Sequence, residues 1–205
     1  FGIKQDGSLW SWGTSNNSWV IADSYDPDDT SFKSDPILID STHKWIYFSS
    51  RRVNFGIDED GKLYTWGIYD YGMGIGELEV GTLMSSITQV GVDSNWKKVK
   101  YINFSSSIGL KNDGSIWYWG YDNQGLFEND KKSYFEPTKL GEYGCDDFYY
   151  ENNLGIVLND TNGYLSSIGR YFYTESKLNY ETFNKKSKFG KGQSRVFSLF
   201  NGRNI

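Results

Sequence analysis

The stretches FGIKQDGSLWSWG (residues 1–13), FGIDEDGKLYTWG (residues 55–67) and IGLKNDGSIWYWG (residues 108–120) are three copies of one pattern. A weaker fourth copy, LGIVLNDTNGYLSSIG, occupies residues 154–169. The glycines at the centre of the copies are 54, 53 and 49 residues apart. These glycines are Gly7, Gly61, Gly114 and Gly163. A period near 50 residues indicates a repeat protein in which each repeat is one supersecondary unit.

Each copy has the pattern of a β-hairpin. Its central Asp-Gly pair favours a two-residue turn, because such turns need the positive φ that glycine adopts freely. After the first turn Leu9 points to one face of the strand, and Trp10 and Trp12 point to the other. The other two strong copies repeat this alternation. Both faces of the hairpin are apolar, which predicts a sheet packed between two neighbouring sheets.

A further aromatic element precedes each later hairpin, with Trp45, Trp96 and Phe148 in equivalent places. Each period then contains about four short strands, which is the content of one propeller blade. The sequence therefore predicts an all-β fold, a β-propeller built of about four four-stranded blades in one domain over residues 1–205. The recurring tryptophans are expected to be core residues and not a sugar-binding set.

The residues after each hairpin carry a family resemblance. Trp66-Gly67 is followed by IYDYG, and Trp119-Gly120 is followed by YDNQG. This arrangement resembles the repeats of the regulator-of-chromosome-condensation type, which also occur in alpha-tubulin-suppressor-like proteins. The resemblance implies a propeller of about seven blades. The residues expected to define the structural repeat are Gly7, Trp12, Gly13, Gly61, Trp66, Gly67, Gly114, Trp119 and Gly120.

The two ends of the sequence carry the same element. Residues 194–202, SRVFSLFNG, have the pattern of the first strand and turn of a fifth hairpin, and residues 1–7 already supply that element. In a ring closed by strand exchange the ends would complement each other instead. We therefore expect an arc of a larger propeller, with a partial fifth hairpin at 194–205.

The composition offers no catalytic or metal-binding set. The chain has one histidine, His43, and one cysteine, Cys145, so a zinc site, an intrachain disulfide and a nucleophile–base pair are not expected. The acidic stretch 23–29 lacks the spacing of a calcium loop, and residues 72–76 lack that of a phosphate or dinucleotide loop. We predict no enzymatic activity, no cofactor, no metal and no small-molecule substrate.

The charge also limits the class of partner. The net charge is −5, whereas nucleic-acid-binding domains usually carry a basic face. The basic residues between 185 and 195 are interpreted as a solvated loop. The sequence contains no run of eighteen apolar residues, so no membrane-spanning helix is expected. Protein partners are the favoured class.

Three inter-repeat loops, residues 14–33, 68–86 and 121–134, differ in length and sequence. Loops on a rigid scaffold carry specificity, and aromatic side chains are typical contact residues. The residues predicted to bind a partner are Trp19, Tyr25, Tyr69, Tyr71 and Tyr121.

Three functions remain open on the sequence alone. The first is a non-enzymatic interaction or structural module, part of a larger assembly such as a virion or a surface structure, as the Asn-, Lys- and Tyr-rich repeats suggest. The second, implied by the family resemblance, is a regulator of a small GTPase that acts in nucleotide exchange. The third is an enzyme-inhibitory or ligand-binding propeller. The first is favoured.

Overall fold

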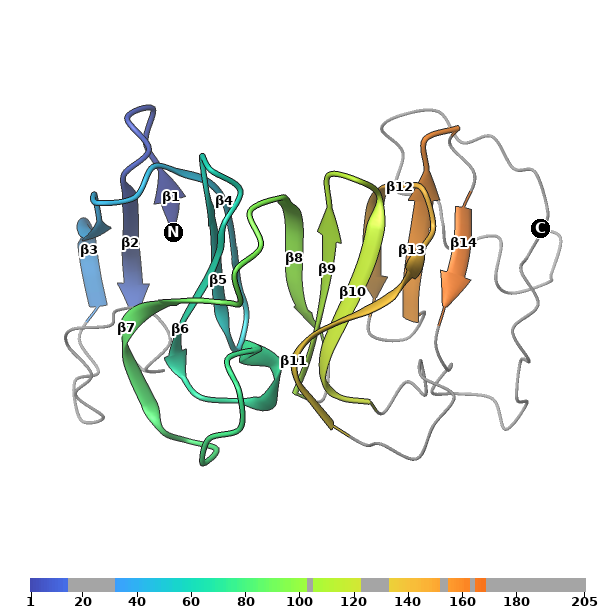
Figure 1. Ribbon diagram of the computed structural model, residues 1–205. Coiled ribbons are helices and arrows are strands. Elements are labelled where there is room, and N and C mark those ends of the chain that lie inside the picture. Colours follow the sequence, from blue (N-terminus) through green and yellow to red (C-terminus); the bar gives the residue numbers. More distant parts are fainter. Residues whose placement is uncertain (15–31, 103–104, 123–132, 152–154, 163–164, 169–205) are drawn as a thin grey trace, which may run out of the picture.

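The computed structural model describes residues 1–14, 32–102, 105–122, 133–151, 155–162 and 165–168, and its strands form four antiparallel sheets (Figure 1). The first blade contains β1 (Gly2–Ile3), β2 (Leu9–Thr14) and β3 (Phe32–Asp40). The second contains β4 (Trp45–Ser50), β5 (Asn54–Asp58), β6 (Leu63–Ile68) and β7 (Leu83–Gln89), with the short 3-10 helix η1 (Tyr71–Met73) between β6 and β7. The third contains β8 (Trp96–Ile102), β9 (Ser106–Lys111), β10 (Ser115–Tyr121) and β11 (Ser133–Glu142). The fourth contains β12 (Cys145–Glu151), β13 (Gly155–Asp160) and β14 (Leu165–Ile168).

The sheets confirm the all-β, propeller-type prediction. In the described residues, the second and third blades have four strands and the first and fourth have three. The sheets follow one another across the molecule in chain order (Figure 1). That the chain is an arc of a larger ring remains a prediction, and the expected fifth hairpin at 194–205 lies outside the described residues.

The Asp-Gly turns join each blade to the next. The carbonyl oxygen of Gly7 accepts a hydrogen bond of 2.9 Å from the amide of Trp45, and that of Gly61 accepts one of 3.0 Å from Trp96. Gly114 and Cys145 repeat the contact at 3.1 Å. At Gly61 φ is 77° and a β-carbon would lie 2.6 Å from the Ser94 carbonyl oxygen, so this position requires glycine on both grounds.

The turn glycines Gly7, Gly61 and Gly114 adopt the positive φ that the Asp-Gly pattern predicts, and the glycines that end the hairpins adopt it as well. Positive φ occurs at each of these glycines: Gly7, Gly13, Gly61, Gly67, Gly114 and Gly120.

The first strands of successive blades are joined by a second recurring bond. The Tyr47 hydroxyl of β4 donates to the carbonyl oxygen of Val99 in β8, at 2.7 Å. Lys98 Nζ, one blade further along, donates to the carbonyl oxygen of Phe148 in β12, at 2.9 Å. Each of these donors is the third residue of its strand. Two different side chains therefore perform the same inter-blade role.

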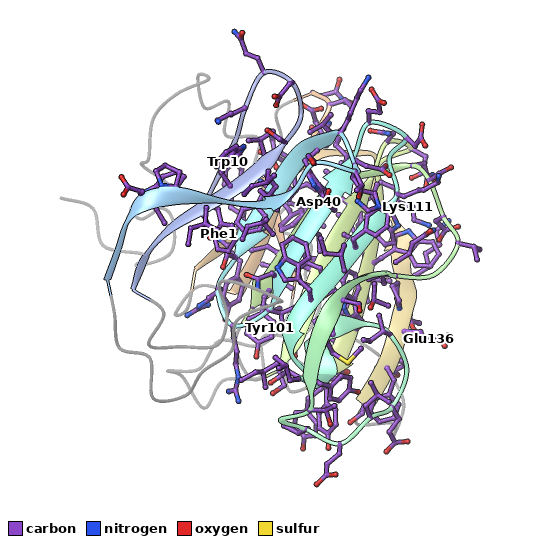
Figure 2. All side chains as sticks on the ribbon, turned by 90° about the vertical axis from the view of Figure 1, so that its left-hand side faces the viewer. Phe1, Trp10, Asp40, Tyr101, Lys111 and Glu136 are labelled. Atoms are coloured by element: carbon purple, nitrogen blue, oxygen red, sulfur yellow. The ribbon has the colours of Figure 1, made fainter. Side chains whose placement is uncertain are left out.

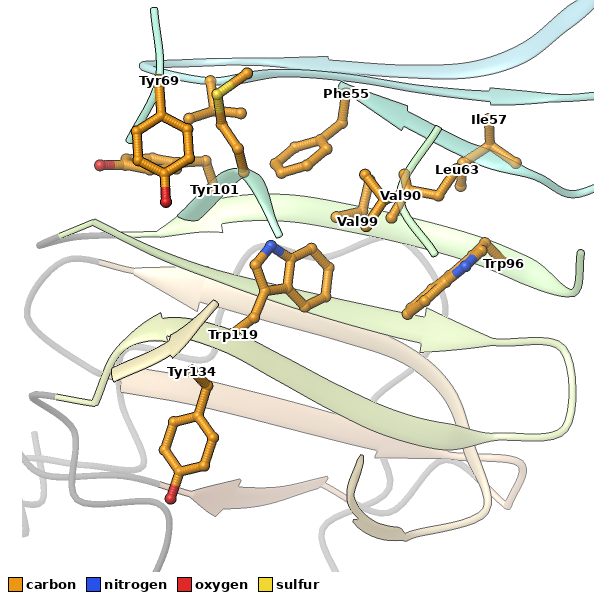
Figure 3. Packing of buried hydrophobic residues seen from close by; sticks show 12 residues of the cluster. Phe55, Ile57, Leu63, Tyr69, Val90, Trp96, Val99, Tyr101, Trp119 and Tyr134 are labelled. Atoms are coloured by element: carbon orange, nitrogen blue, oxygen red, sulfur yellow. The ribbon is translucent and has the colours of Figure 1, made fainter. Parts of the chain in front are cut away.

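Tryptophans of the repeat fill the junctions between blades, as predicted. Trp66 and Trp119 are fully buried. Trp119 packs edge-to-face on Phe55 of the second blade, with ring centroids 5.9 Å apart, and Trp96 lies beside it (Figure 3). Contacts of this kind make a continuous core between consecutive sheets.

The prediction that Trp12 is a core residue is wrong. Its side chain is 48% exposed, although it holds the same repeat position as Trp66 and Trp119. Those two side chains pack toward the preceding blade, and in the described residues no sheet precedes the first one. Among the described residues Trp12 lies over its own sheet, at Gly2, where a β-carbon would lie 3.1 Å from the indole ring. Figure 2 looks onto this first blade.

In the fourth blade, side chains of other sizes take the places of the tryptophan and glycine that pack together in the third blade. In the third blade Gly109 pairs with Val99, and a β-carbon there would lie 2.5 Å from the ring of Trp96. In the fourth blade Leu158 holds the glycine's register position, opposite Phe148. Cys145 starts β12 as Trp96 starts β8, so the prediction that Phe148 is the counterpart of Trp96 is wrong, and Phe148 corresponds to Val99. In the third blade Gly109 leaves room for the ring of Trp96. In the fourth blade Cys145 replaces that ring, and Leu158 replaces the glycine.

The same register corrects the alignment of the fourth copy. Gly155 pairs with Glu151, as Ser106 pairs with Ile102 in the third blade. Gly155 is therefore the counterpart of Ser106 and not of Gly109. The hairpin of β13 and β14 lies within the predicted range 154–169, but Val157, and not Leu154, is the counterpart of Ile108.

Candidate protein-interaction surface

The loop from β6 to β7 begins with a short helical turn. Asp70 caps this turn, because its Oδ1 accepts a hydrogen bond of 3.1 Å from the amide of Gly72. Gly74, with φ of 79°, ends it. Met73 is fully buried in the core between the second and third blades. The first half of this loop is therefore an internal part of the fold.

This half of the loop is hydrogen-bonded to the third blade. The carbonyl oxygen of Gly72 accepts from Trp119 Nε1 and from Ser107 Oγ, each at 2.7 Å. The amide of Gly76 donates to the carbonyl oxygen of Phe135 in β11, at 3.1 Å. These bonds fix the loop on a neighbouring sheet.

Asp70 adds a charged contact at the same junction. Its buried carboxylate accepts from Ser105 Oγ at 3.0 Å and lies 3.3 Å from Arg52 Nε. The nearby Tyr101 hydroxyl accepts from the Ser105 amide. Burial, and then the charge of Asp70, raise the pKa of Tyr101 to about 12, so the phenol is neutral at physiological pH.

Tyr69 was predicted to be exposed in a partner-binding loop, and the structure contradicts this, since its side chain is fully buried. Its amide donates to the carbonyl oxygen of Thr82 at 2.7 Å, and its carbonyl oxygen accepts from the amide of Gly81 at 3.0 Å. Its hydroxyl donates to the carbonyl oxygen of Gly76 at 2.7 Å, and burial raises its pKa. Tyr69 is therefore a positioning residue that holds both ends of the segment 76–82.

The segment that Tyr69 holds is exposed and partly apolar. Leu78, Val80 and Leu83 are 41%, 47% and 37% exposed. Glu77 and Glu79 lie between and beside them, are exposed, and form no ion pair with the described residues. We call these five residues the outer tip.

The outer tip has a defined backbone shape. Thr82 closes a turn by donating to the carbonyl oxygen of Glu79, from its amide at 3.1 Å and from its hydroxyl at 2.7 Å. Exposed apolar side chains on a fixed backbone need little ordering when they bind, which favours recognition by another protein.

The other predicted contact residues are distributed differently. Tyr71 is half-buried, with its ring 5.5 Å from that of Phe135. Tyr121 is 41% exposed, at the end of β10. Trp19 and Tyr25 lie outside the described residues. Of the five predicted residues, Tyr121 alone is placed by the structure as an exposed aromatic.

The sequence interpretation missed the outer tip because it gave weight only to aromatic residues. The available signal was the alternation of acidic and aliphatic residues in ELEV, residues 77–80, which ends at the Gly81-Thr82 pair before β7. In a strand, half of such aliphatic side chains would face the core. Here Leu78 and Val80 lie in a loop that is fixed by hydrogen bonds to Tyr69, and they are exposed.

The cysteine and the histidine, which are candidate reactive residues by type, lie in structural contacts. Cys145 is buried, and burial followed by the charge of Asp160 raises its pKa to about 11, so it is a thiol and not a reactive thiolate. Asp40 Oδ2 accepts from Trp45 Nε1 at 2.8 Å and lies 3.1 Å from His43 Nδ1. Burial by itself would raise the pKa of Asp40, but the hydrogen bonds from Thr42, His43 and Trp45 outweigh it and lower that pKa.

Neither a metal site nor a membrane helix is found in the part of the chain that the structure describes. No three His, Cys, Asp or Glu side chains gather there as they would around a metal ion. None of its helices is long and apolar enough to cross a bilayer.

Several solved structures share this fold. Human WBSCR16 matches with a TM-score of 0.63 and 18% identity, over 81% of this chain and 43% of that one. Prp20p from Saccharomyces cerevisiae, which was studied with its binding to Gsp1p and histones, matches with a TM-score of 0.62 and 15% identity, over 82% and 41%. Yeast RCC1 (Prp20) bound to Kap60 matches with a TM-score of 0.56 and 17% identity, over 82% and 39%.

The match extends to part of those proteins only. The chain spans about two fifths of the length of each of these structures. No protein-family model and no curated protein matches the sequence. The successive sheets, the glycine turns and these structural matches together show that the chain has the β-propeller fold of the regulator-of-chromosome-condensation type.

Proposed function

We propose that this chain is a non-enzymatic protein-interaction module and that the outer tip of the second blade is its contact surface. The observation that carries the proposal is the contrast within one loop. Residues 69–76 are fixed between two blades, and Leu78 and Val80, only a few residues further along, are exposed. Binding residues are found disproportionately often on loops that a rigid scaffold positions, which is the arrangement of this loop.

The structural matches support the class of partner. Prp20p, which has the same fold, binds Gsp1p and histones, and it has been crystallised with Kap60. A protein partner is therefore the proposed ligand here also. Membership of a larger assembly, such as a virion or a surface structure, is part of the same proposal and is supported by the Asn-, Lys- and Tyr-rich composition of the repeats. The alternative, regulation of a small GTPase, rests on the shared fold alone.

The test is affinity capture with a double variant, Leu78→Ser with Val80→Ser. Both side chains are exposed, so the variant should keep the thermal midpoint of the wild type within a few degrees. The matched control is Val92→Ser, because Val92 is exposed (92%) in the connection to the third blade. We expect the proteins captured by wild type and by the control to be lost from the double variant, as measured by quantitative mass spectrometry. Equal capture by all three proteins would overturn the proposal.

A further inference from the structure

The outermost strands of the first three blades can be compared residue by residue. Their registers against the neighbouring strand align Ile37 of β3 and Thr138 of β11 with Thr88 of β7, because these residues pair with Ser11, Tyr118 and Thr65. All three strands share the same two-residue register shift at their other end. The three strands occupy the same place in their blades, so a residue that differs between β7 and the other two strands can be compared position by position.

The residue before this aligned position is proline in two of the three strands. Pro36 stands there in β3 and Pro137 in β11, but β7 has Ile87. A proline on an edge strand removes a backbone N–H and prevents another strand from pairing there. The preserved register also shows that the sheet does not need the N–H of this position. β7 retains that N–H.

A further protection against strand pairing is missing from β7. An exposed acid precedes each proline, Asp35 in β3 and Glu136 in β11, whereas β7 has the uncharged Ser86, and no residue of β7 is charged. Prolines, charges and bulges are the devices by which proteins block sheet edges. The second blade keeps the shared bulge, but it has neither the proline nor the acid of its two sister strands.

The edge of β7 also has an unpaired side. In the described residues β7 pairs with β6 alone and is the last strand of its sheet. The outer tip continues directly into β7, since Leu83 is the first residue of that strand. The exposed apolar side chains and the unblocked backbone edge therefore form one continuous surface.

We propose that the outer edge of β7 binds an extended segment of a partner protein, which adds a strand to the second blade. The proposal rests on the proposed function and specifies the mode of binding. Main-chain hydrogen bonds to the edge supply affinity, and side-chain contacts supply specificity. The segment that fits has an aliphatic residue over Leu78 and Val80 and a lysine or arginine beside Glu77 and Glu79, which have no ion-pair partner in the described residues.

The test uses a random-peptide display library selected on the wild-type chain, and the selected peptides are then measured by fluorescence anisotropy. Ile87→Pro copies the two sister strands, so the variant should fold, with an unchanged circular dichroism spectrum. The Ile87 side chain packs against the core cluster that contains Trp45 and Trp66, so the thermal midpoint of Ile87→Pro is compared with that of Ile87→Ala, which loses the same packing. Ile87→Pro should bind the selected peptides at least about tenfold more weakly. Ile87→Ala keeps the N–H and removes more side chain, so it should bind within about twofold of wild type. Ser86→Glu copies Glu136 and should weaken binding without any proline.

Hydrogen exchange locates the bound strand. The amides of residues 86–89 should exchange more slowly when a selected peptide is bound. Selected peptides that bind Ile87→Pro and Ser86→Glu as tightly as wild type, or a selection that yields no peptide, would overturn the proposal. Concentration-dependent dimers of wild type that Ile87→Pro abolishes would also overturn it, because a second copy would then be the occupant. The Leu78→Ser, Val80→Ser variant can lose its protein partner while the Ile87→Pro variant still binds that partner. In that case the proposed function stands and this inference fails.

Discussion

The indole nitrogen of Trp119 lies 2.7 Å from the carbonyl oxygen of Gly72 and donates a hydrogen bond to it across the junction of the second and third blades. Trp119 belongs to the hairpin of the third blade, and Gly72 lies in the loop that follows the hairpin of the second blade. The loop that presents the outer tip is thereby held by a repeat tryptophan. Under the proposed function, Trp119 acts through the shape of this loop and not as a contact residue.

Trp119→Phe should destabilise the chain by about 1–3 kcal/mol, because it removes a buried hydrogen bond and part of a buried ring. Ser107 Oγ still donates to the Gly72 carbonyl oxygen, which limits the loss. The free energy of unfolding in urea measures this. Trp12→Phe is the matched control, since Trp12 is half-exposed, and should change stability by less than about 0.5 kcal/mol.

Alanine replacement of the glycine that ends each hairpin should have a graded effect. All three glycines have positive φ, which strains any alanine by roughly 1–2 kcal/mol. A β-carbon would meet nothing within 4 Å at Gly13, Asn54 Nδ2 at 3.2 Å at Gly67, and the Ser105 carbonyl oxygen at Gly120. Unfolding experiments should therefore rank Gly120→Ala as the most destabilised, then Gly67→Ala, then Gly13→Ala. Equal losses would contradict the packing described here.

Lys111 makes a cation–π contact that a double-mutant cycle can measure. Its buried ammonium lies 3.6 Å from the ring centroid of Trp117 and 2.6 Å from Asp93 Oδ2. Lys111→Met keeps most of the stem and removes the charge, and it should lower stability by about 1–2 kcal/mol. Combined with Trp117→Leu, the two losses should be less than additive by about 0.5–2 kcal/mol.

The second blade shows why Lys111 and Trp117 should be coupled. In the first blade Lys4 Nζ lies over Trp10 at 3.4 Å, so lysine and tryptophan occur together. In the second blade Asp58 and Tyr64 take both places, and the Tyr64 hydroxyl donates to Asp58 Oδ2 at 3.1 Å. Between blades the two positions change together, from lysine with tryptophan to aspartate with tyrosine. Strictly additive losses in the cycle would contradict this interpretation.

Stability should decrease in alkali through the buried thiol. Burial raises the pKa of Cys145 to about 11, above its ordinary value of 9.0. The folded state then holds a proton that the unfolded state releases, so this contribution is complete below about pH 9 and is lost as the pH rises toward 11. Urea unfolding of wild type across this range should show a steeper decrease than that of Cys145→Ala. Parallel curves would show that the thiol titrates normally.

Much of the fold follows from the sequence because its determinants are local. The Asp-Gly turns and the period-two alternation act within thirteen-residue copies, and the structure confirms the hairpins and the positive φ of the turn glycines Gly7, Gly61 and Gly114. The exposure of Trp12 did not follow, since burial depends on the neighbouring sheet and not on the copy itself.

The candidate site followed less well from the sequence, for a related reason. Tyr69 stands in a loop, yet it is buried because that loop folds back onto the third blade, which lies far along the chain. Its role in holding the exposed Leu78 and Val80 depends on hydrogen bonds to Gly76, Gly81 and Thr82. The lack of proline in β7 was visible in the sequence, but only the register showed that Ile87 occupies the place of Pro36 and Pro137.

The most direct test of the interaction module is the hydrogen-exchange footprint of the chain in complex with its captured protein partner. The outer tip and the Asp60-Gly61 turn lie at opposite ends of β6 and therefore report on opposite sides of the second blade. Slower exchange at residues 77–83, with unchanged exchange at residues 59–62, is the predicted result. Slower exchange at residues 59–62, with residues 77–83 unaffected, would contradict the assignment of the outer tip as the contact surface.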